Sequence, residues 1–335
     1  MSKSTLSPPF PTLLQDFFCQ RLINQRNASD CTIAAYRDTF RLLLRYLEEH
    51  HSMYPSEVML DDLGAPRILA FLNHLEKARK NSIRSRNSRL AALRSFFKYA
   101  ASRAPASLPT IQSVLAIPMK RYDRRLLGFL SREEIQAVLD APDPSTWSGQ
   151  RDRMMFTLLY NTGARVSEII AINVADVSLD RGASVRIRGK GRKERSIPLW
   201  KSTALTVRQW MKRIDQSPTS PLLANSFGNP MSRSGVGSRL KQAVAVASKK
   251  QTTLVGRAIS PHTIRHTTAM HLLQSGVELS VIAMWLGHES TVTTHMYMET
   301  DLAMKDRALQ RLQPASAKRH RYRPTDKLLR FLESL

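Results

Sequence analysis

Acidic residues and cysteines are scarce in this chain of 335 residues. It has 27 Asp and Glu against 51 Lys and Arg, which gives a formal net charge of +24. Such an excess of positive charge predicts a polyanionic partner, most simply nucleic acid. The two cysteines, Cys19 and Cys31, are too few for a disulfide framework in a chain of this size and lack the spacing of metal ligands. We therefore expect both to be reduced thiols in the core.

Long apolar runs are also missing. No stretch approaches the roughly 20 residues that cross a bilayer, so no membrane association is expected. The first residues, MSKSTLSPPF, lack the apolar core of a signal peptide, which favours a cytoplasmic or nucleoid location. No Walker motif and no carboxylate cluster of the two-metal type are seen, so we expect neither a nucleotide cofactor nor a metal.

The length fits two domains, each large enough to bury a core. In the N-terminal part, apolar residues recur at helical spacing in four stretches, near 13–18, 33–47, 66–78 and 82–101. Ser29 or Asp30 is the expected N-cap of the second stretch. Four helices with short connections predict a small all-α bundle.

The fourth of these helices and its approach carry only positive charge. A solvated face usually mixes both signs, so this run favours contact with nucleic acid. Such contacts to phosphates position a duplex without reading its sequence. The basic residues between positions 77 and 103 are Lys77, Arg79, Lys80, Arg84, Arg86, Arg89, Arg94, Lys98 and Arg103.

Residues 104–127 combine three prolines with a basic cluster, a composition typical of an inter-domain linker. The cluster consists of Lys120, Arg121, Arg124 and Arg125, and its charges would lie close to DNA if the two domains clamp a duplex. We expect an N-terminal DNA-binding domain at 1–115, the linker at 116–127, a second domain at 128–312 and a basic tail with a terminal helix at 313–335.

The second domain reads as mainly helical with one β-hairpin. Ser131 and Glu134 form a capping box, and a helix over 151–160 is expected to stop at Gly163. Alternation on both sides of residues 189–191 predicts a hairpin over 185–199 with Lys190 at or near its tip. Its glycines and positive charges suit a loop along DNA, with Arg192 and Lys193 among the contacts. Further helices are predicted over 201–214, 232–247, 261–276 and 279–286.

The stretch from Ser260 to Tyr297 holds the strongest chemical signal. His262 and Arg265 are three residues apart in a helix, so they share a face and can reach the same phosphate. A Gly-His step at His288 and then Tyr297 follow. Tyr297 would be the group that attacks the phosphate. His266 and His271, on the same helix, are interpreted as packing or supporting residues.

In chain order, the sequence contains TGARVSEI around Arg165, GKGRKER around Lys190, HTIR from His262, LGH ending at His288 and TTHMY ending at Tyr297. With these five motifs the chain strongly resembles the tyrosine recombinase, or phage integrase, family. The resemblance covers the whole second domain, and the N-terminal bundle is similar to the family's core-binding domain. Within the family, the sequence resembles Xer-type resolvases and the integrases of mobile elements, and the 38 residues after the tyrosine favour a mobile-element enzyme.

This resemblance implies that Tyr297 attacks a phosphorus and cuts one strand, leaving a 3′-phosphotyrosine and a free 5′-hydroxyl. Arg165 and Arg265 would hold the phosphate oxygens with permanently charged donors, and His288 would be a further donor. Glu168 would orient Arg165 or His262, or it is a plain carboxylate on a helix surface.

Two protons must also move. Tyrosine has an ordinary pKa of about 10, so its phenol needs an acceptor, and His262 is the candidate. The departing 5′-oxygen needs a proton, which Lys190 would supply from the hairpin.

By resemblance, the partners are double-stranded recombination sites and a homotetramer on DNA, with or without a second related recombinase. The terminal segment 325–335 has one apolar face, which docks on a neighbouring protomer or folds back on its own domain. A relaxing topoisomerase that acts alone and a non-catalytic DNA-binding protein of the same fold are the alternative functions.

Overall fold

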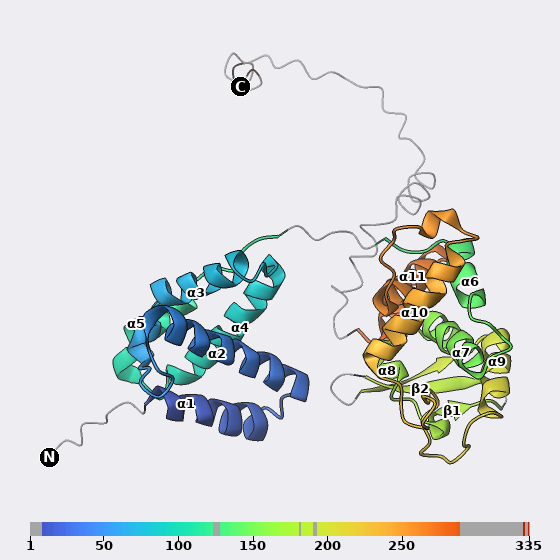
Figure 1. The fold of residues 1–335 in the computed structure, drawn as a ribbon, viewed down its shortest axis with the longest axis horizontal. Coiled ribbons are helices and arrows are strands. Elements are labelled where there is room, and N and C mark those ends of the chain that lie inside the picture. The colour runs from blue at the N-terminus through green and yellow to red at the C-terminus, as the bar shows by residue number, and fades with distance from the viewer. Residues whose placement is uncertain are drawn as a thin grey trace. The chain divides into compact units, whose positions relative to one another are not determined.

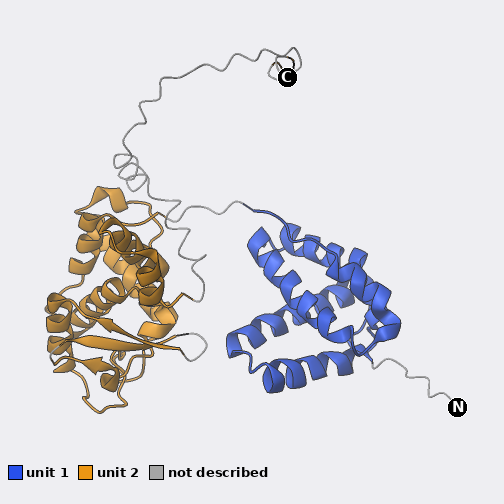
Figure 2. Cartoon of the chain, turned by 180° about the vertical axis from the view of Figure 1, so that it is seen from behind, with its two compact units in different colours: residues 1–125 blue, residues 126–335 orange. Residues whose placement is uncertain are grey.

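The computed structural model describes residues 9–122, 128–180, 182–189 and 193–288, together with residues 331 and 334. The chain divides into two compact units, residues 1–125 and 126–335 (Figure 2). Helices dominate both, and the strands described form one three-stranded sheet in the second unit (Figure 1). The predicted fold, mainly α with a small β-hairpin and two domains, is confirmed.

The first unit is a helical bundle with an aromatic core. Phe17 is fully buried, and the centroid of its ring lies 5.5 Å from that of the Phe96 ring. Ser29 is the N-cap of the second helix, since its Oγ accepts from the Thr32 amide at 3.4 Å. The helices are α1 (Phe10–Asp16), the π-helix η1 (Phe17–Gln25), α2 (Asp30–His51), α3 (Ala65–Lys77), α4 (Ile83–Ala100) and α5 (Leu108–Leu115).

Helix α5 corrects the reading of residues 104–127 as a linker throughout. Its proline, Pro109, lies in the first turn, where the missing N–H costs no intrahelical bond. Ile111 and Val114 on its inner face are fully buried in the core of the first unit. Proline content therefore marked the start of a helix here, and no linker begins before this helix ends.

Both cysteines are exposed, so the prediction of buried thiols was wrong. Cys19 lies on η1, where Phe17 and Leu22 are the buried residues. Cys31 lies in the first turn of α2, ahead of the buried positions of that helix, which begin at Thr39. Both are free thiols.

The second unit begins with the predicted capping box, in which the Glu134 amide donates to Ser131 Oγ and the Ser131 amide donates to Glu134 Oε2. Its helices and strands are α6 (Arg132–Asp140), α7 (Trp147–Thr162), α8 (Val166–Ile169), β1 (Val177–Ser178), β2 (Ser184–Arg188), β3 (Glu194–Pro198), α9 (Lys201–Met211), α10 (Arg233–Ala247), α11 (Pro261–Gln274) and α12 (Leu279–Leu286).

The sheet has the order β1-β2-β3 with antiparallel pairing. Val185 pairs with Ile197 and both are buried, as the predicted alternation requires. The Gly189 amide donates to the Lys193 carbonyl oxygen at 2.7 Å and closes the hairpin at its described end. Strand β1, only two residues long, was not predicted, since so short a segment shows no alternation.

Helix α11 packs on α7, α10 and α12, and Figure 1 shows it beside α10. It starts as predicted, with Ser260 as N-cap and Pro261 at its first position. Ten of its fourteen residues are buried, so most of its circumference is covered by neighbouring helices. In the described ranges, no helix combines the length and apolar character that crossing a bilayer requires.

Candidate functional site

Arg265 joins the C-terminal ends of two helices. The residue is 3% exposed, and its guanidinium donates from Nη1 to the Gly163 carbonyl oxygen at 2.6 Å, where α7 ends. From Nη2 it donates to the Leu286 carbonyl oxygen at 2.8 Å, where α12 ends. Two separate chain segments are thereby fixed relative to the first turn of α11. His262, on the same turn, is exposed.

Arg165 follows the end of α7 directly. Gly163 adopts a left-handed conformation with φ of 59°, which terminates the helix and turns the chain into α8. The Arg165 Nη1 atom donates to Glu168 Oε1 at 2.7 Å, and its amide donates to Glu168 Oε2 at 2.9 Å. Arg165 remains about 40% exposed in its side chain, so it can still reach a ligand.

Glu168 is buried, which excludes the alternative that it is a plain surface carboxylate. Burial by itself would raise its pKa, but hydrogen bonds from Arg195 and Arg165 outweigh that effect and hold the pKa below its ordinary value. The carboxylate is therefore an anion with fixed partners. Of the two residues that Glu168 was predicted to orient, Arg165 is bonded to it directly.

His288 follows the left-handed Gly287, whose φ is 66°, and its amide donates to the Ala283 carbonyl oxygen at 2.9 Å. Burial, together with nearby positive charges, lowers the pKa of His288 from 6.5 to about 4, and burial is the larger cause. These charges belong to Arg265, Arg165, Arg195 and His262, in decreasing order. The structure therefore brings four of the six predicted site residues, Arg165, His262, Arg265 and His288, around one place.

Arg195 is the cation that the sequence did not single out. It donates from Nη2 to Glu168 Oε2 at 2.7 Å and from Nε to the Trp285 carbonyl oxygen at 2.9 Å. In sequence it is one of five basic residues between 188 and 195, and nothing distinguished it from the others. The structure sets it apart on β3, where it pairs with Ile187 and is half-buried, while Glu194 and Ser196 beside it are exposed.

Lys190 and Tyr297, the predicted general acid and nucleophile, lie outside the described residues. The neighbouring Gly189 is described, and a Cβ built on it would lie 3.5 Å from Glu168 Oε1. Gly189 therefore lies beside the buried carboxylate. Arg124 and Arg192, two of the predicted DNA contacts, are also outside the described residues.

Comparison with known proteins agrees with the resemblance that the five motifs indicate. Residues 128–304 match the model of the phage integrase family, and residues 16–104 match its N-terminal SAM-like domain. The chain belongs to the phage integrase family. It is a tyrosine recombinase, an enzyme that cuts and rejoins DNA at specific sites.

Among its relatives is the integrase/recombinase y4rC of Sinorhizobium fredii. The two sequences are 47% identical over 96% of this chain and 97% of the relative's chain. The tyrosine recombinase XerD of Pseudomonas putida is 31% identical over 92% of this chain and 97% of its own. The Tn1549 transposon integrase with transposon right end DNA has a TM-score of 0.68 at 17% identity, covering 90% of this chain and 99% of that one. This likeness shows the shared fold.

The predicted DNA contacts of this recombinase differ in exposure. The prediction that Arg86 contacts DNA was wrong, because this residue is 2% exposed. Its Nε lies 3.8 Å from Glu76 Oε2, and its Nη1 donates to the Pro118 carbonyl oxygen at 3.4 Å. It fastens the chain after α5 to α4 and cannot lie against a duplex. Arg89 and Arg94 are half-buried. The exposed members of the predicted set are Lys77, Arg79, Lys80, Arg84, Arg121 and Lys193.

His266 and His271 are both buried, in keeping with a packing role. His271 Nδ1 and Tyr160 Oη lie 2.7 Å apart. Burial, followed by the charge of Arg132, lowers the pKa of His271 below its usual value.

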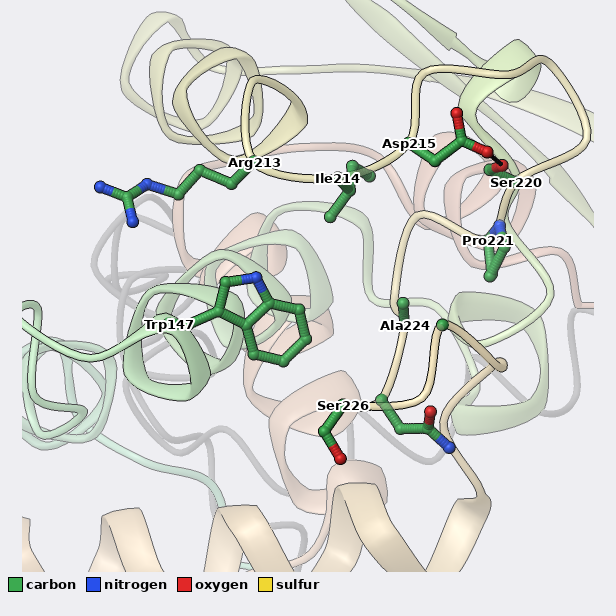
Figure 3. A pocket seen from close by; sticks show the side chains of 10 residues that line it. Trp147, Arg213, Ile214, Asp215, Ser220, Pro221, Ala224 and Ser226 are labelled. Atoms are coloured by element: carbon green, nitrogen blue, oxygen red, sulfur yellow. Dashed lines mark hydrogen bonds between the residues drawn. The ribbon is translucent and has the colours of Figure 1, made fainter.

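A cavity of about 480 Å³ in the recombinase lies elsewhere (Figure 3). The indole of Trp147 forms one wall and Ile214 and Pro221 form others, with Arg213 and Asp215 at its edge. None of the predicted site residues lines it. Within the described part of the chain, no cluster of three or more His, Cys, Asp or Glu side chains could hold a metal ion.

Proposed function

We propose that this recombinase cuts DNA by attack of Tyr297 Oη on a backbone phosphorus. The new bond joins Oη to phosphorus, and the bond from phosphorus to the 5′-oxygen breaks, which leaves a 3′-phosphotyrosine and a 5′-hydroxyl. Rejoining reverses these steps with another 5′-hydroxyl. The observation that supports this most directly is the convergence of Arg165, Arg265 and His262 on His288.

In this proposal Arg165 and Arg265 bind the non-bridging oxygens of the scissile phosphate. Attack concentrates negative charge on those oxygens, and guanidinium groups held in place need no rearrangement as that charge develops. The backbone bonds of Arg265 and the carboxylate bonds of Arg165 support the required rigidity. His288, neutral at pH 7 because its pKa is about 4, donates one further N–H.

His262 accepts the phenolic proton of Tyr297, and Lys190 protonates the departing 5′-oxygen. The phosphotyrosine conserves the energy of the broken bond, and the guanidinium groups supply the positive charge, so we propose that neither ATP nor a metal takes part. Cleavage at the same rate with and without EDTA would agree with this, and a loss of rate in EDTA that Mg²⁺ restores would contradict it.

For assembly we propose a homotetramer on double-stranded DNA, acting at the nucleoid on the ends of a mobile element. Joining two duplexes requires four strand cuts. Proteins of similar fold include a lambda integrase tetramer bound to a Holliday junction and the Tn1549 transposon integrase in complex with transposon right end DNA. We further propose that the terminal segment 325–335 docks on the neighbouring protomer. Unchanged tetramer formation after truncation at Pro314, measured by light scattering on DNA, would refute that docking.

The deciding experiment uses a radiolabelled nicked duplex whose sequence is first selected from DNA flanking the gene by binding to the protein. The wild type is expected to form a covalent adduct on a denaturing gel, with the label retained on the 5′ side of the cut. Tyr297→Phe must abolish the adduct, while Tyr122→Phe, at an exposed tyrosine of the first unit, must leave it unchanged. An adduct formed by Tyr297→Phe would disprove the nucleophile.

Lys190→Ala provides a second, independent test. The variant should bind the duplex with unchanged affinity and form the adduct slowly, because only the protonation of the 5′-oxygen is affected. A 5′-thiol leaving group, which needs no proton, should restore its rate. A normal rate on the ordinary duplex would remove Lys190 from the mechanism.

A further inference from the structure

The Glu168 carboxylate lies between two arginines that reach it from different segments. Its Oε1 accepts from Arg165 Nη1 and its Oε2 accepts from Arg195 Nη2, both at 2.7 Å. The side chains of Glu168 and Arg195 are 4% and 12% exposed, so this pair is shielded from water. A charge pair in such a setting is directional and costly to rearrange.

Arg195 is also fixed to a third segment. Its Nε donates to the Trp285 carbonyl oxygen at 2.9 Å, three residues before His288. Its guanidinium lies against the backbone of Gly287: a Cβ built there would be 2.8 Å from Arg195 Nη1. One guanidinium therefore contacts both the carboxylate that holds Arg165 and the chain that leads into His288.

The other end of β3 has its own anchor. Asn161, on α7, donates from Nδ2 to the Pro198 carbonyl oxygen at 3.1 Å, and its Oδ1 accepts from the Trp200 amide at 2.9 Å. Arg195 is the corresponding anchor at the end of β3 that is close to Glu168. Together, Asn161 and Arg195 anchor β3 by hydrogen bonds at both of its ends.

We infer that Arg195 is a positioning residue of this recombinase: it locks β3 and the segment that carries His288 against Arg165, so that the phosphate-binding groups keep one geometry. A lysine cannot replace it, because a single ammonium cannot reproduce the two divergent bonds to Glu168 and Trp285. The positive charge of Arg195 also contributes to the low pKa of His288. This inference rests on the proposed function, since cleavage by Tyr297 is one of its readouts.

The test measures adduct formation and DNA affinity separately for Arg195→Lys, with Arg195→Gln as a second variant in case the first does not fold. Arg186→Lys is the matched control, because Arg186 lies on the same hairpin but pairs with Asp176, away from Glu168. At saturating protein, Arg195→Lys and Arg195→Gln should form the adduct about 100-fold more slowly, the size of effect that a displaced group produces. Their Kd for the duplex and the rate of Arg186→Lys should change less than about twofold.

Two further readouts separate positioning from general stability. In a Glu168→Gln background, Arg195→Lys should slow cleavage by less than about threefold, because the partner through which it acts is already altered. By NMR, the midpoint of the His288 titration should rise in Arg195→Gln and not in Arg186→Lys. Wild-type rates in both folded Arg195 variants would overturn the inference, as would full additivity with Glu168→Gln. If the wild type itself gave no adduct, the proposed function would fail instead, and the NMR comparison would still test Arg195.

Discussion

Arg265 donates a hydrogen bond of 2.6 Å to the carbonyl oxygen of Gly163, which lies 102 positions earlier in the chain. Helix C-termini present carbonyl oxygens without intrahelical partners, and a buried guanidinium satisfies two such ends at once here. The same side chain therefore organises the site and stabilises the packing of α7, α11 and α12.

Arg265→Lys is expected to abolish most of the cleavage activity while leaving DNA binding nearly intact. Lysine keeps the charge but cannot reach both carbonyl oxygens and a phosphate together, so the loss should be about 100-fold or more. Single-turnover cleavage at saturating protein measures it. Arg213→Lys, at an exposed arginine beside the cavity of Figure 3, is the control. Similar rates for both variants would contradict the assignment of Arg265.

Gly163→Ala should destabilise the second unit by about 2–4 kcal/mol, as the sum of left-handed strain and overpacking. A Cβ at Gly163 would lie 2.5 Å from Leu286 Cδ2, and φ is 59°. Gly276→Ala is the control: its φ is 85° but nothing lies within 4 Å, so it should cost only about 1–2 kcal/mol. Urea unfolding followed by tryptophan fluorescence is suitable, because all four tryptophans belong to the second unit. Equal losses would refute the steric argument.

Arg84→Ala should affect DNA binding, whereas Arg86→Ala should affect the stability of the first unit. Arg84 is exposed, so its loss should weaken DNA binding and reduce the slope of log affinity against log salt by about 1. Arg86 is buried beside Glu76, and its loss should instead destabilise the first unit by about 1–3 kcal/mol, because the Pro118 carbonyl loses its bond from Arg86 and Glu76 keeps its ion pair with Lys120 but loses the buried charge of Arg86. Salt-titrated binding and peptide-level hydrogen exchange of the full chain distinguish the two. A reduced slope of log affinity against log salt in Arg86→Ala would show that Arg86 contacts DNA after all.

His288 should remain neutral down to about pH 5 and titrate near pH 4, as heteronuclear NMR of its ring can show. Its pKa falls from 6.5 to about 4 on folding, so between those pH values the unfolded chain binds more protons. The contribution of His288 to stability is thus complete above pH 6.5 and is lost as pH falls toward 4. His288→Gln should flatten this part of the stability profile. A ring that titrates near 6.5 would show that the cations do not surround it.

The helices and the hairpin were predictable because burial imposes the 3.6- and 2-residue periods on the sequence. The meeting of Arg165, Arg265 and His288 was predictable only through the five motifs and their resemblance to a family. Periodicity says nothing about which helix ends adjoin, and that is decided by the bonds from Arg265 to Gly163 and Leu286.

Runs of basic residues did not predict which of their members are exposed and which are buried in ion pairs. Arg86 and Arg84 look alike in a basic run, but only one faces Glu76. Arg195 likewise could not be told from Arg192 or Lys193, since its partners Glu168 and Trp285 are distant in sequence. In both cases the deciding information is a tertiary contact.

The bond between the Gly189 amide and the Lys193 carbonyl has a consequence for the evolution of this hairpin. It closes the ladder before the loop begins, so chain inserted or removed beyond it leaves the register of β2 and β3 intact. Arg195 then keeps its place against Glu168 while the loop varies in length. A descendant of this enzyme can in this way exchange the residues between Gly189 and Lys193 without displacing the arginine that is bonded to Glu168.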